Sequence, residues 1–242
     1  MSYKIDNAII MAAGMASRFA PISDECPKAL LEVKGEILIE RQIRQLIEAG
    51  VPQIIIVVGY MKERFAYLQD KFGVTLIENS EYTTRNNHSS IYAVRKYLKN
   101  SYICSVDNYF PVNPFHAEER EAFYSAIYID GQTEEWCITT NQEGYIKEVV
   151  VGGTDAWIML GHVFWTQDFS DKFMEILKRD YDTKEIRNKL WESIYLDNIK
   201  TLHLKMKKYQ VDEIYEFDSV AELKEFDKNY RYNCDDGFNK NT

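Results

Sequence analysis

Residues 7–28 read NAIIMAAGMASRFAPISDECPK, and this stretch decides the fold. It opens with the short apolar run Asn7 to Ala12 and passes directly into Ala13-Gly14. A continuous apolar run that feeds a glycine turn is typical of a parallel strand buried on both faces of its sheet. We therefore predict an early parallel strand whose carboxyl end carries a loop.

The residues that follow repeat this strand and connect the two copies by a helix. Gln53 to Val58 is a second apolar run, and it ends at Gly59. Between the runs, apolar residues recur at helical spacing: Ile39, Ile43, Leu46 and Ile47. The alternation continues with a helix over 62–72, a strand over 74–77, a helix over 89–98 and a strand over 102–106. This pattern predicts an α/β fold with a Rossmann-like, doubly wound sheet flanked by helices.

After Asn108 the pattern changes to segments rich in aromatic and β-branched residues, which favour strands. We predict strands over 124–129, 136–140, 146–151, 156–164, 202–207 and 214–217, and helices over 168–179, 187–199 and 220–226. They would extend the sheet into a mixed sheet with a β-rich second part. One domain over 1–230 is predicted, with a first part (1–108), a β-rich part (109–230) and a flexible tail (231–242).

Charge and composition exclude several classes of protein. A net charge of −9 argues against binding to nucleic acid or to an anionic membrane, because both need clustered Lys and Arg. No apolar run approaches the roughly 20 residues of a membrane-spanning helix. The apolar stretch after Asp6 lacks the basic start of a signal peptide. We therefore expect a cytoplasmic enzyme; the sequence leaves its oligomeric state open, a homodimer included.

Two cations, Arg18 and Lys28, follow the loop predicted after the first strand. Backbone N–H groups of a small-residue turn can approach phosphate oxygens. We predict these nucleotide-binding residues: Ala12, Ala13, Gly14 and Met15. Nucleotidyl transfer builds negative charge on phosphate oxygens, which Arg18 and Lys28 would stabilise as catalytic residues. The stretch matches neither GxxxxGK[ST] nor GxGxxG, and the alternative is an ordinary turn with two solvated cations.

Three carboxylates are the predicted ligands of a Mg²⁺ ion. Asp107 ends a buried strand, where an ionised carboxylate is costly unless a cation or hydrogen bonds compensate it. Magnesium prefers hard oxygen ligands, so a second carboxylate has to come from elsewhere in the fold. Glu216 and Asp218 lie at strand spacing on one face and are the candidates. Taken singly, each acid could instead be solvated, and Asp218 could cap the helix after Ser219.

The motifs AAGMASRFAP and PKALLEVKGEILIERQI resemble the signature of the nucleotidyltransferases that make NDP-sugars and CDP-alcohols. Over nearly its full length the chain is most similar to the bacterial CTP:phosphocholine cytidylyltransferases. The further segments that carry this resemblance are Val58-Gly59-Tyr60, Asn86-Asn87, Asp107-Asn108-Tyr109, Glu135-Trp136 and residues 214–219. The resemblance implies a nucleotidyltransferase fold, Mg²⁺ dependence and the transfer of CMP from CTP, and it suggests the same three carboxylates as metal ligands.

The stretch RNNHSS over residues 85–90 combines amides, hydroxyls and the start of a predicted helix. Such groups could read the edge of a base or cap the helix, and Ser89 is the predicted cap. The resemblance places this stretch against the cytosine, with Asn87 and Ser90 as the preferred contacts. Discrimination of CTP from UTP follows from the resemblance alone.

Aromatic and acidic residues of the second half are the predicted acceptor site. An aromatic box with one acid would bind a cationic amine, and its members would be Trp136, Trp157, Trp191, Tyr195 and Glu192. The tryptophans could equally be core residues. Leu190-Trp191-Glu192 replaces a more aromatic Tyr-Trp-Asp in the relatives. Fewer rings and a longer acid could favour a primary amine, as in 2-aminoethylphosphonate or phosphoethanolamine, over phosphocholine.

Two other functions are compatible with parts of this pattern. An NDP-sugar pyrophosphorylase would use the same loop with UTP or dTTP and a sugar 1-phosphate, but would prefer hydroxyl and amide contacts to an aromatic box. A non-catalytic nucleotide-binding module would be expected to lack Lys28 or Asp107, and both are present. The leading prediction is a cytidylyltransferase that acts on a small amine-bearing phosphate or phosphonate. Residues 1–108 would be its nucleotide-binding part and 109–230 its acceptor and metal part.

Overall fold

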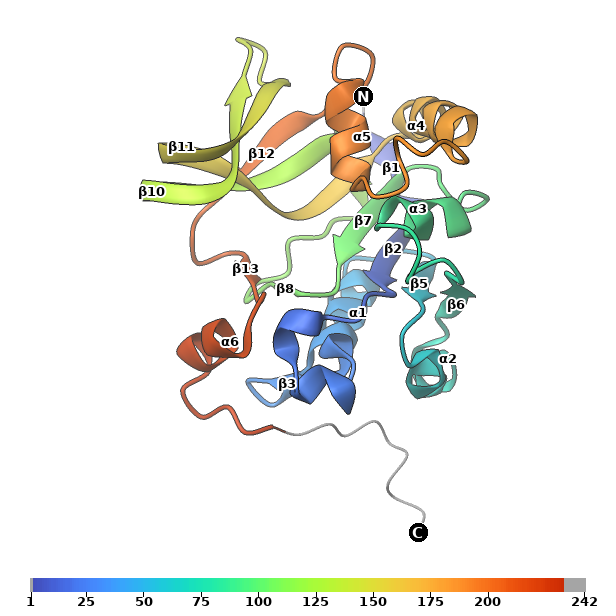
Figure 1. Ribbon diagram of the computed structural model, residues 1–242, viewed down its shortest axis with the longest axis vertical. Helices are drawn as coiled ribbons and strands as arrows, with labels where there is room; N and C mark the ends of the chain where they lie inside the picture. Colours follow the sequence, from blue (N-terminus) through green and yellow to red (C-terminus); the bar gives the residue numbers. More distant parts are fainter. Residues whose placement is uncertain (1, 233–242) are drawn as a thin grey trace.

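The computed structural model describes residues 2–232 and is built around a seven-stranded sheet of order β12-β10-β11-β7-β2-β5-β6 (Figure 1). The parallel strands at its centre are β2 (Asn7–Ala12), β5 (Ile54–Val58), β6 (Thr75–Glu78) and β7 (Ser101–Ser105). β2 lies between β5 and β7, so the winding direction changes beside β2. In such sheets, ligands bind outside the carboxyl ends of the strands at this point.

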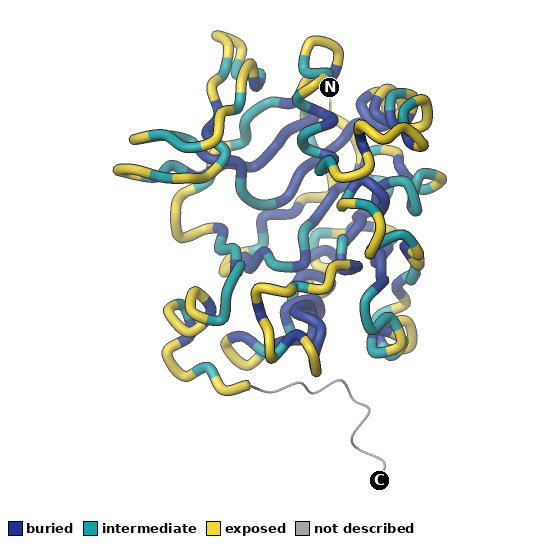
Figure 2. Tube along the Cα trace, in the orientation of Figure 1, coloured by how far each residue is buried: buried dark blue, intermediate teal, exposed yellow. Residues whose placement is uncertain are grey.

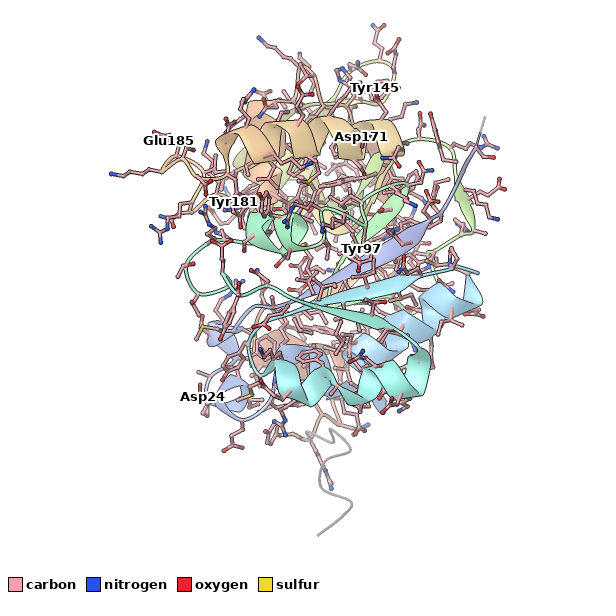
Figure 3. All side chains as sticks on the ribbon, turned by 90° about the vertical axis from the view of Figure 1, so that its right-hand side faces the viewer. Asp24, Tyr97, Tyr145, Asp171, Tyr181 and Glu185 are labelled. Carbon is pink, nitrogen blue, oxygen red and sulfur yellow. The ribbon has the colours of Figure 1, made fainter. Side chains whose placement is uncertain are left out.

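Helices cover both faces of the sheet, which confirms the doubly wound prediction. Alternate residues of β2 point to opposite sides: Ile10 packs in the core beneath α1 (Leu38–Glu48) and α2 (Tyr67–Phe72). Ile9 packs in the core beneath α3 (His88–Ala93), α4 (Gln167–Asp180) and α5 (Trp191–Asp197). In Figure 3 α3 and α4 lie on one side of the central strands and α1 and α2 on the other. Figure 2 shows the central strands as the buried part of the chain.

The second half extends the sheet with two long antiparallel strands, β10 (Phe123–Thr140) and β11 (Ile146–Trp165), and with β12 (Lys205–Tyr209). The four strands predicted over 124–164 are correctly located, but they are parts of these two. Irregular register between Ile129 and Gln132, around Gly131 at φ 83°, bends the pair. Trp157 consequently pairs with Tyr128 on one side and with Ile138 on the other.

Short strand pairs complete the architecture. They are β1 (Tyr3–Lys4) with β9 (Glu118–Glu119), β3 (Glu32–Val33) with β4 (Glu36–Ile37), and β8 (Asn108–Tyr109) with β13 (Tyr215–Glu216). Single 3₁₀ turns are η1 (Ser17–Phe19), η2 (Ile22–Asp24), η3 (Lys28–Leu30) and η4 (Lys62–Phe65), and α6 (Val220–Phe226) is the last helix. The β8–β13 pair is the most important of these for the functional site, because it brings the segments around residues 107 and 217 together.

Several helices are shorter than predicted. The segment 62–72 divides into η4 and α2, and α3 ends at Ala93 rather than at 98. α5 starts at Trp191 rather than at 187, because backbone carbonyls of the preceding residues accept hydrogen bonds from the loop before α3. Within 2–232 no helix has the length and apolar character needed to cross a membrane. Most of the predicted tail, 233–242, lies outside the described residues.

Candidate active site

A cleft of about 300 Å³ opens at the carboxyl ends of β2 and β7, where the sheet changes winding direction. It brings together nine predicted site residues: Ala12, Ala13, Gly14, Arg18, Lys28, Asn87, Ser90, Asp107 and Asp218. Met15 belongs to the same loop, but its side chain is exposed and does not line the cleft. Segments from four distant parts of the chain therefore meet at one place.

Gly59 holds the loop after β2 in position. The Tyr60 N–H donates to the Ala13 carbonyl at 3.1 Å, which ties the loop to the end of β5. A Cβ atom at Gly59 would lie 2.8 Å from the Ala13 carbonyl oxygen and 2.8 Å from Cδ1 of Tyr82. Both neighbours line the cleft, so only glycine fits between them.

We expect Gly59→Ala to weaken nucleotide binding, because the new methyl group must displace either the Ala13 carbonyl or the Tyr82 ring. Overpacking of this kind costs about 1–3 kcal/mol, so the KM for the nucleotide should rise about tenfold. Steady-state kinetics beside thermal unfolding would separate a displaced loop from general destabilisation. An unchanged nucleotide KM would show that the loop does not depend on this contact.

The charged end of the cleft holds two cations between carboxylates. Lys28 is only 9% exposed, and its Nζ lies 3.1 Å from Oδ2 of Asp107 and 3.8 Å from Oδ1 of Asp218. Arg18 is exposed, and its Nη2 donates to Oδ1 of Asp218 at 2.8 Å. Lys28 also lies over the ring of Phe19, 4.9 Å from its centroid. Both predicted catalytic cations thus face the same end of the cleft.

Asp107, Glu216 and Asp218 each offer one carboxylate oxygen, and these oxygens lie within 4.8 Å of one another. The β8–β13 pairing brings these three carboxylates together, and the Phe217 N–H donates to the Asp107 carbonyl at 3.3 Å. Burial, and then the charges of Asp107 and Asp218, raise the pKa of Glu216 well above its usual range. Oδ1 of Asp107 is buried without a hydrogen-bond partner in the described chain. A divalent cation fits this oxygen-rich cluster.

The cap of α6 is supplied by Ser219, which leaves Asp218 free for the cleft. The Ser219 hydroxyl accepts from the Glu222 N–H, and Glu222 accepts from the Ser219 N–H, so the two form a capping box. The Asp218 side chain instead accepts the Arg18 hydrogen bond. Capping therefore does not account for this acid.

The opposite end of the cleft carries amides and hydroxyls, together with the guanidinium of Arg85, which donates to Glu81. Ser89 does not cap α3 as predicted: the helix begins at His88, and the Ser89 hydroxyl donates to the Asn86 carbonyl at 2.8 Å. The Asn87 amide donates to Oε2 of Glu192 at 3.0 Å and accepts from the Trp191 N–H at 2.7 Å. Contact of Asn87 with a base stays a prediction, and its amide already links the cleft to α5.

Further bonds join residues 81–88 to the segment that leads into α5. Tyr181, labelled near α3 in Figure 3, donates to Glu81, and the Arg85 guanidinium lies 4.2 Å above the Tyr181 ring. Arg187 donates to the Thr84 carbonyl at 3.1 Å. The amide end of the cleft and the start of α5 are consequently one hydrogen-bonded unit.

The predicted acceptor residues lie beyond Asn87, on the sheet face covered by α3, α4 and α5. Trp191 is only 1% exposed and packs in the core, edge-on to Trp165. Trp136 and Trp157 are half-buried against the same core, and Trp157 carries Lys208 4.6 Å above its ring. Direct contact of these rings with a ligand stays a prediction.

Glu192 is the acidic group of this region. Burial raises its pKa to about 7, while the Asn87 hydrogen bond opposes the rise. Tyr124 stacks on Trp191, with the ring centroids 5.8 Å apart. Burial is the main cause of the raised pKa of Tyr124, and the charges of Glu192, Glu216 and Asp107 raise it further. Tyr124 is thus near enough to Glu192 and to two acids of the carboxylate cluster to feel their charges. No sequence signal distinguishes it from the other aromatic strand residues.

Known proteins resemble this chain over most of its length. Residues 8–152 match the MobA-like NTP transferase domain. The choline-phosphate cytidylyltransferase of Streptococcus pneumoniae is 35% identical over 91% of this chain and 96% of that protein. The 2-aminoethylphosphonate cytidylyltransferase of Lancefieldella rimae is 34% identical over 93% of this chain and 94% of that protein.

Solved structures extend the comparison to the fold. The CTP:phosphocholine cytidylyltransferase of Streptococcus pneumoniae superposes with a TM-score of 0.88 at 34% identity, covering 93% of this chain and 99% of that chain. An inositol-1-phosphate CTP transferase from T. maritima, at a TM-score of 0.71 and 16% identity, shares the fold. The nucleotidyltransferase fold and the predicted enzyme class are confirmed. This chain belongs to the MobA-like NTP transferase family, within its group of bacterial cytidylyltransferases.

Proposed function

We propose that this protein transfers CMP from CTP to a phosphate or phosphonate oxygen of a small amine-bearing acceptor and releases pyrophosphate. The observation that carries the proposal is the division of one cleft. One end holds Arg18, Lys28, Asp107 and Asp218, with Glu216 beside the two acids, and these groups suit a triphosphate with its metal ion. The other end holds amides and hydroxyls, which suit a base, and the guanidinium of Arg85, which is paired with Glu81.

The reaction needs positioning and charge stabilisation more than proton transfer. An acceptor oxygen forms a bond to the α-phosphorus of CTP while the bond to the bridging oxygen of the β-phosphate breaks, and pyrophosphate leaves with that oxygen. The acceptor is already anionic, so no general base is required. Lys28 would stabilise charge on the α-phosphate and Arg18 on the leaving phosphates.

A Mg²⁺ ion completes the proposed chemistry. Asp107, Glu216 and Asp218 would hold it, and the orphaned oxygen of Asp107 and the mutual repulsion of the three acids support this assignment. Bound there, the ion would neutralise charge on the triphosphate. Lys28 and Arg18 would then act on the phosphate oxygens that the ion leaves free.

The acidic surroundings of Tyr124 support a cationic acceptor. Glu192, Glu216 and Asp107 all act on this residue, and Glu192 is hydrogen-bonded to Asn87 of the cleft, so an amine could pair with Glu192 while its phosphate faces the cleft. Leu190 offers no ring to a quaternary ammonium, which favours a primary amine, as in 2-aminoethylphosphonate or phosphoethanolamine, over phosphocholine.

Pyrophosphate release tests the proposal. The four common NTPs would be combined with phosphocholine, phosphoethanolamine, 2-aminoethylphosphonate and glucose 1-phosphate, each with and without EDTA. Release is expected with CTP and an amine-bearing acceptor, and only when Mg²⁺ is present. Activity confined to UTP or dTTP with the sugar phosphate would indicate a pyrophosphorylase, and no release with any pair would indicate a binding module.

Glu192→Gln should raise the KM for the acceptor with little change in the KM for CTP. Loss of a charge-assisted hydrogen bond costs about 1.5–3 kcal/mol, so a rise of roughly tenfold or more is expected. In the unmodified protein the acceptor KM should also rise as the pH falls through about 7, because Glu192 becomes protonated and loses its charge.

A surface acid supplies the control for this variant. Glu185, labelled in Figure 3, is exposed in the turn before α5, and Glu185→Gln should leave both KM values unchanged. The Glu192→Gln variant should lose the change in acceptor KM near pH 7, whereas titration of the acceptor phosphate itself would remain. If Glu192→Gln and Glu185→Gln had equal KM values for the acceptor, the proposal that Glu192 binds the acceptor would be wrong.

A further inference from the structure

Asn79 lines the amide end of the cleft in one fixed orientation. It follows β6, is 4% exposed, and its N–H donates to the Val58 carbonyl at 2.8 Å. The side-chain Oδ1 accepts from the Glu81 N–H at 3.0 Å, and Nδ2 donates to Ser89 Oγ at 2.8 Å and to Ser90 Oγ at 3.1 Å. A backbone N–H can only donate, so the oxygen must face Glu81 and the NH₂ group must face the serines.

This orientation decides what the two hydroxyls can do. Ser89 accepts from Asn79 and donates to the Asn86 carbonyl at 2.8 Å, so its proton is used within the loop. Ser90 also accepts from Asn79, but no described residue accepts its proton. Ser90 is only 4% exposed and lines the cleft. Its proton is therefore available to a ligand, and the nearly buried hydroxyl acts as a donor.

A donor at this position distinguishes the two pyrimidines. Cytosine carries an unprotonated N3, which accepts a hydrogen bond, whereas N3 of uracil carries a proton and donates one. We propose that Asn79 is a specificity-determining residue, which directs the Ser90 proton towards N3 of cytosine and so selects CTP over UTP. The inference rests on the proposed use of CTP. With UTP, Ser90 could accept from N3–H only through its second lone pair, and its own proton would then have no partner in a nearly closed site, which is strongly disfavoured.

Asn79 acts through Ser90, so its role is one of positioning and needs a test that a merely structural residue would not pass. In Asn79→Asp, one carboxylate oxygen can keep the Glu81 N–H bond while the other accepts the Ser90 proton. The lone pairs of Ser90 would then face the cleft and suit the N3–H of uracil. In Asn79→Ala, Ser90 is free to donate or accept, and discrimination is lost without being reversed.

The experiment measures kcat/KM for CTP and for UTP with one acceptor in the full-length protein. The ratio of the two values should fall at least tenfold in Asn79→Asp and in Asn79→Ala, with the larger fall in Asn79→Asp. Ser90→Ala should lower it as well. Asn141→Asp is the matched control, because Asn141 uses its side-chain oxygen in a surface turn that aspartate can also form, and the ratio should be unchanged.

Two failures can be told apart. An unmodified protein without preference for CTP would overturn the proposed function itself. An unmodified protein that prefers CTP, together with Asn79 variants that lose CTP and UTP activity equally, would overturn only the role of Asn79. Thermal unfolding of each variant shows whether the loop still folds, and the ratio is independent of the fraction of active enzyme.

Discussion

Lys28→Ala should lower kcat by about 10²–10³-fold, which corresponds to about 3–4 kcal/mol of transition-state stabilisation. Lys28 is the nearly buried cation at the charged end of the cleft, held between Asp107 and Asp218. The other nearly buried cation that lines the cleft, Arg85, is paired with Glu81 at the amide end. The free energy of unfolding should fall by less, because cleft water can solvate Asp107 once its partner is removed.

Two further variants make this result specific. Lys28→Arg keeps the charge but not the shape, and should retain more activity than the alanine variant. Lys172→Ala removes a lysine from an exposed ion pair with Asp168 on α4 and should leave kcat unchanged. Single-turnover measurements of pyrophosphate release would report the chemical step. A Lys28→Ala enzyme with nearly full kcat would exclude Lys28 from stabilisation of the transition state.

Asp107→Asn should produce the second large loss, because it replaces one of the three carboxylates of the proposed metal site by an amide. Metal-ion stabilisation of phosphate charge amounts to several kcal/mol, so we expect activity to fall about 10²-fold or more at limiting Mg²⁺. Part of the activity should return as the Mg²⁺ concentration is raised. The measurement is the dependence of the rate on Mg²⁺ at saturating CTP.

A remote acid again provides the comparison. Asp168→Asn changes an exposed carboxylate on α4 and should leave the Mg²⁺ dependence unaltered. Direct binding of Mn²⁺ in the presence of CTP would show whether Asp107→Asn weakens the affinity for the metal or only the reaction. An unmodified enzyme that keeps its activity in EDTA would contradict the metal assignment.

The central sheet could be predicted because its signals are local. Ala8 to Ala12 and Ile54 to Val58 are apolar throughout, as burial on both faces requires, and the helix between them has an apolar face of helical period. Arg18 and Lys28 follow the first strand within one short stretch. The loop, the cations and the end of the strand therefore had to lie near one another.

Long-range pairing was harder to predict from the sequence. Nothing local indicates that Asn108 pairs with Glu216, yet this register brings the three carboxylates together. The strands β10 and β11 also looked like four strands, because their bends around Gly131 and Gly152 resemble turns. In both cases the pairing depends on which distant segment of the chain lies beside each strand.

Side-chain roles set by hydrogen bonds across the fold were beyond sequence reasoning. Asn87 looked like a base contact, but its amide also holds Glu192 and the first N–H of α5. Asn79 carried no signal at all, since its role depends on the Glu81 N–H and on two serines of the next helix. Such assignments require the position of every donor and acceptor.

The position of a bound nucleotide and its metal ion tests the central claim most directly. A crystal grown with a non-hydrolysable CTP analogue and Mn²⁺ would locate the metal by anomalous diffraction. The expected result is one Mn²⁺ peak among Asp107, Glu216 and Asp218, with the α-phosphate within hydrogen-bonding distance of Lys28 Nζ and the base beside Ser90. A nucleotide bound outside this cleft, or a metal ion away from these carboxylates, would contradict the proposed mechanism.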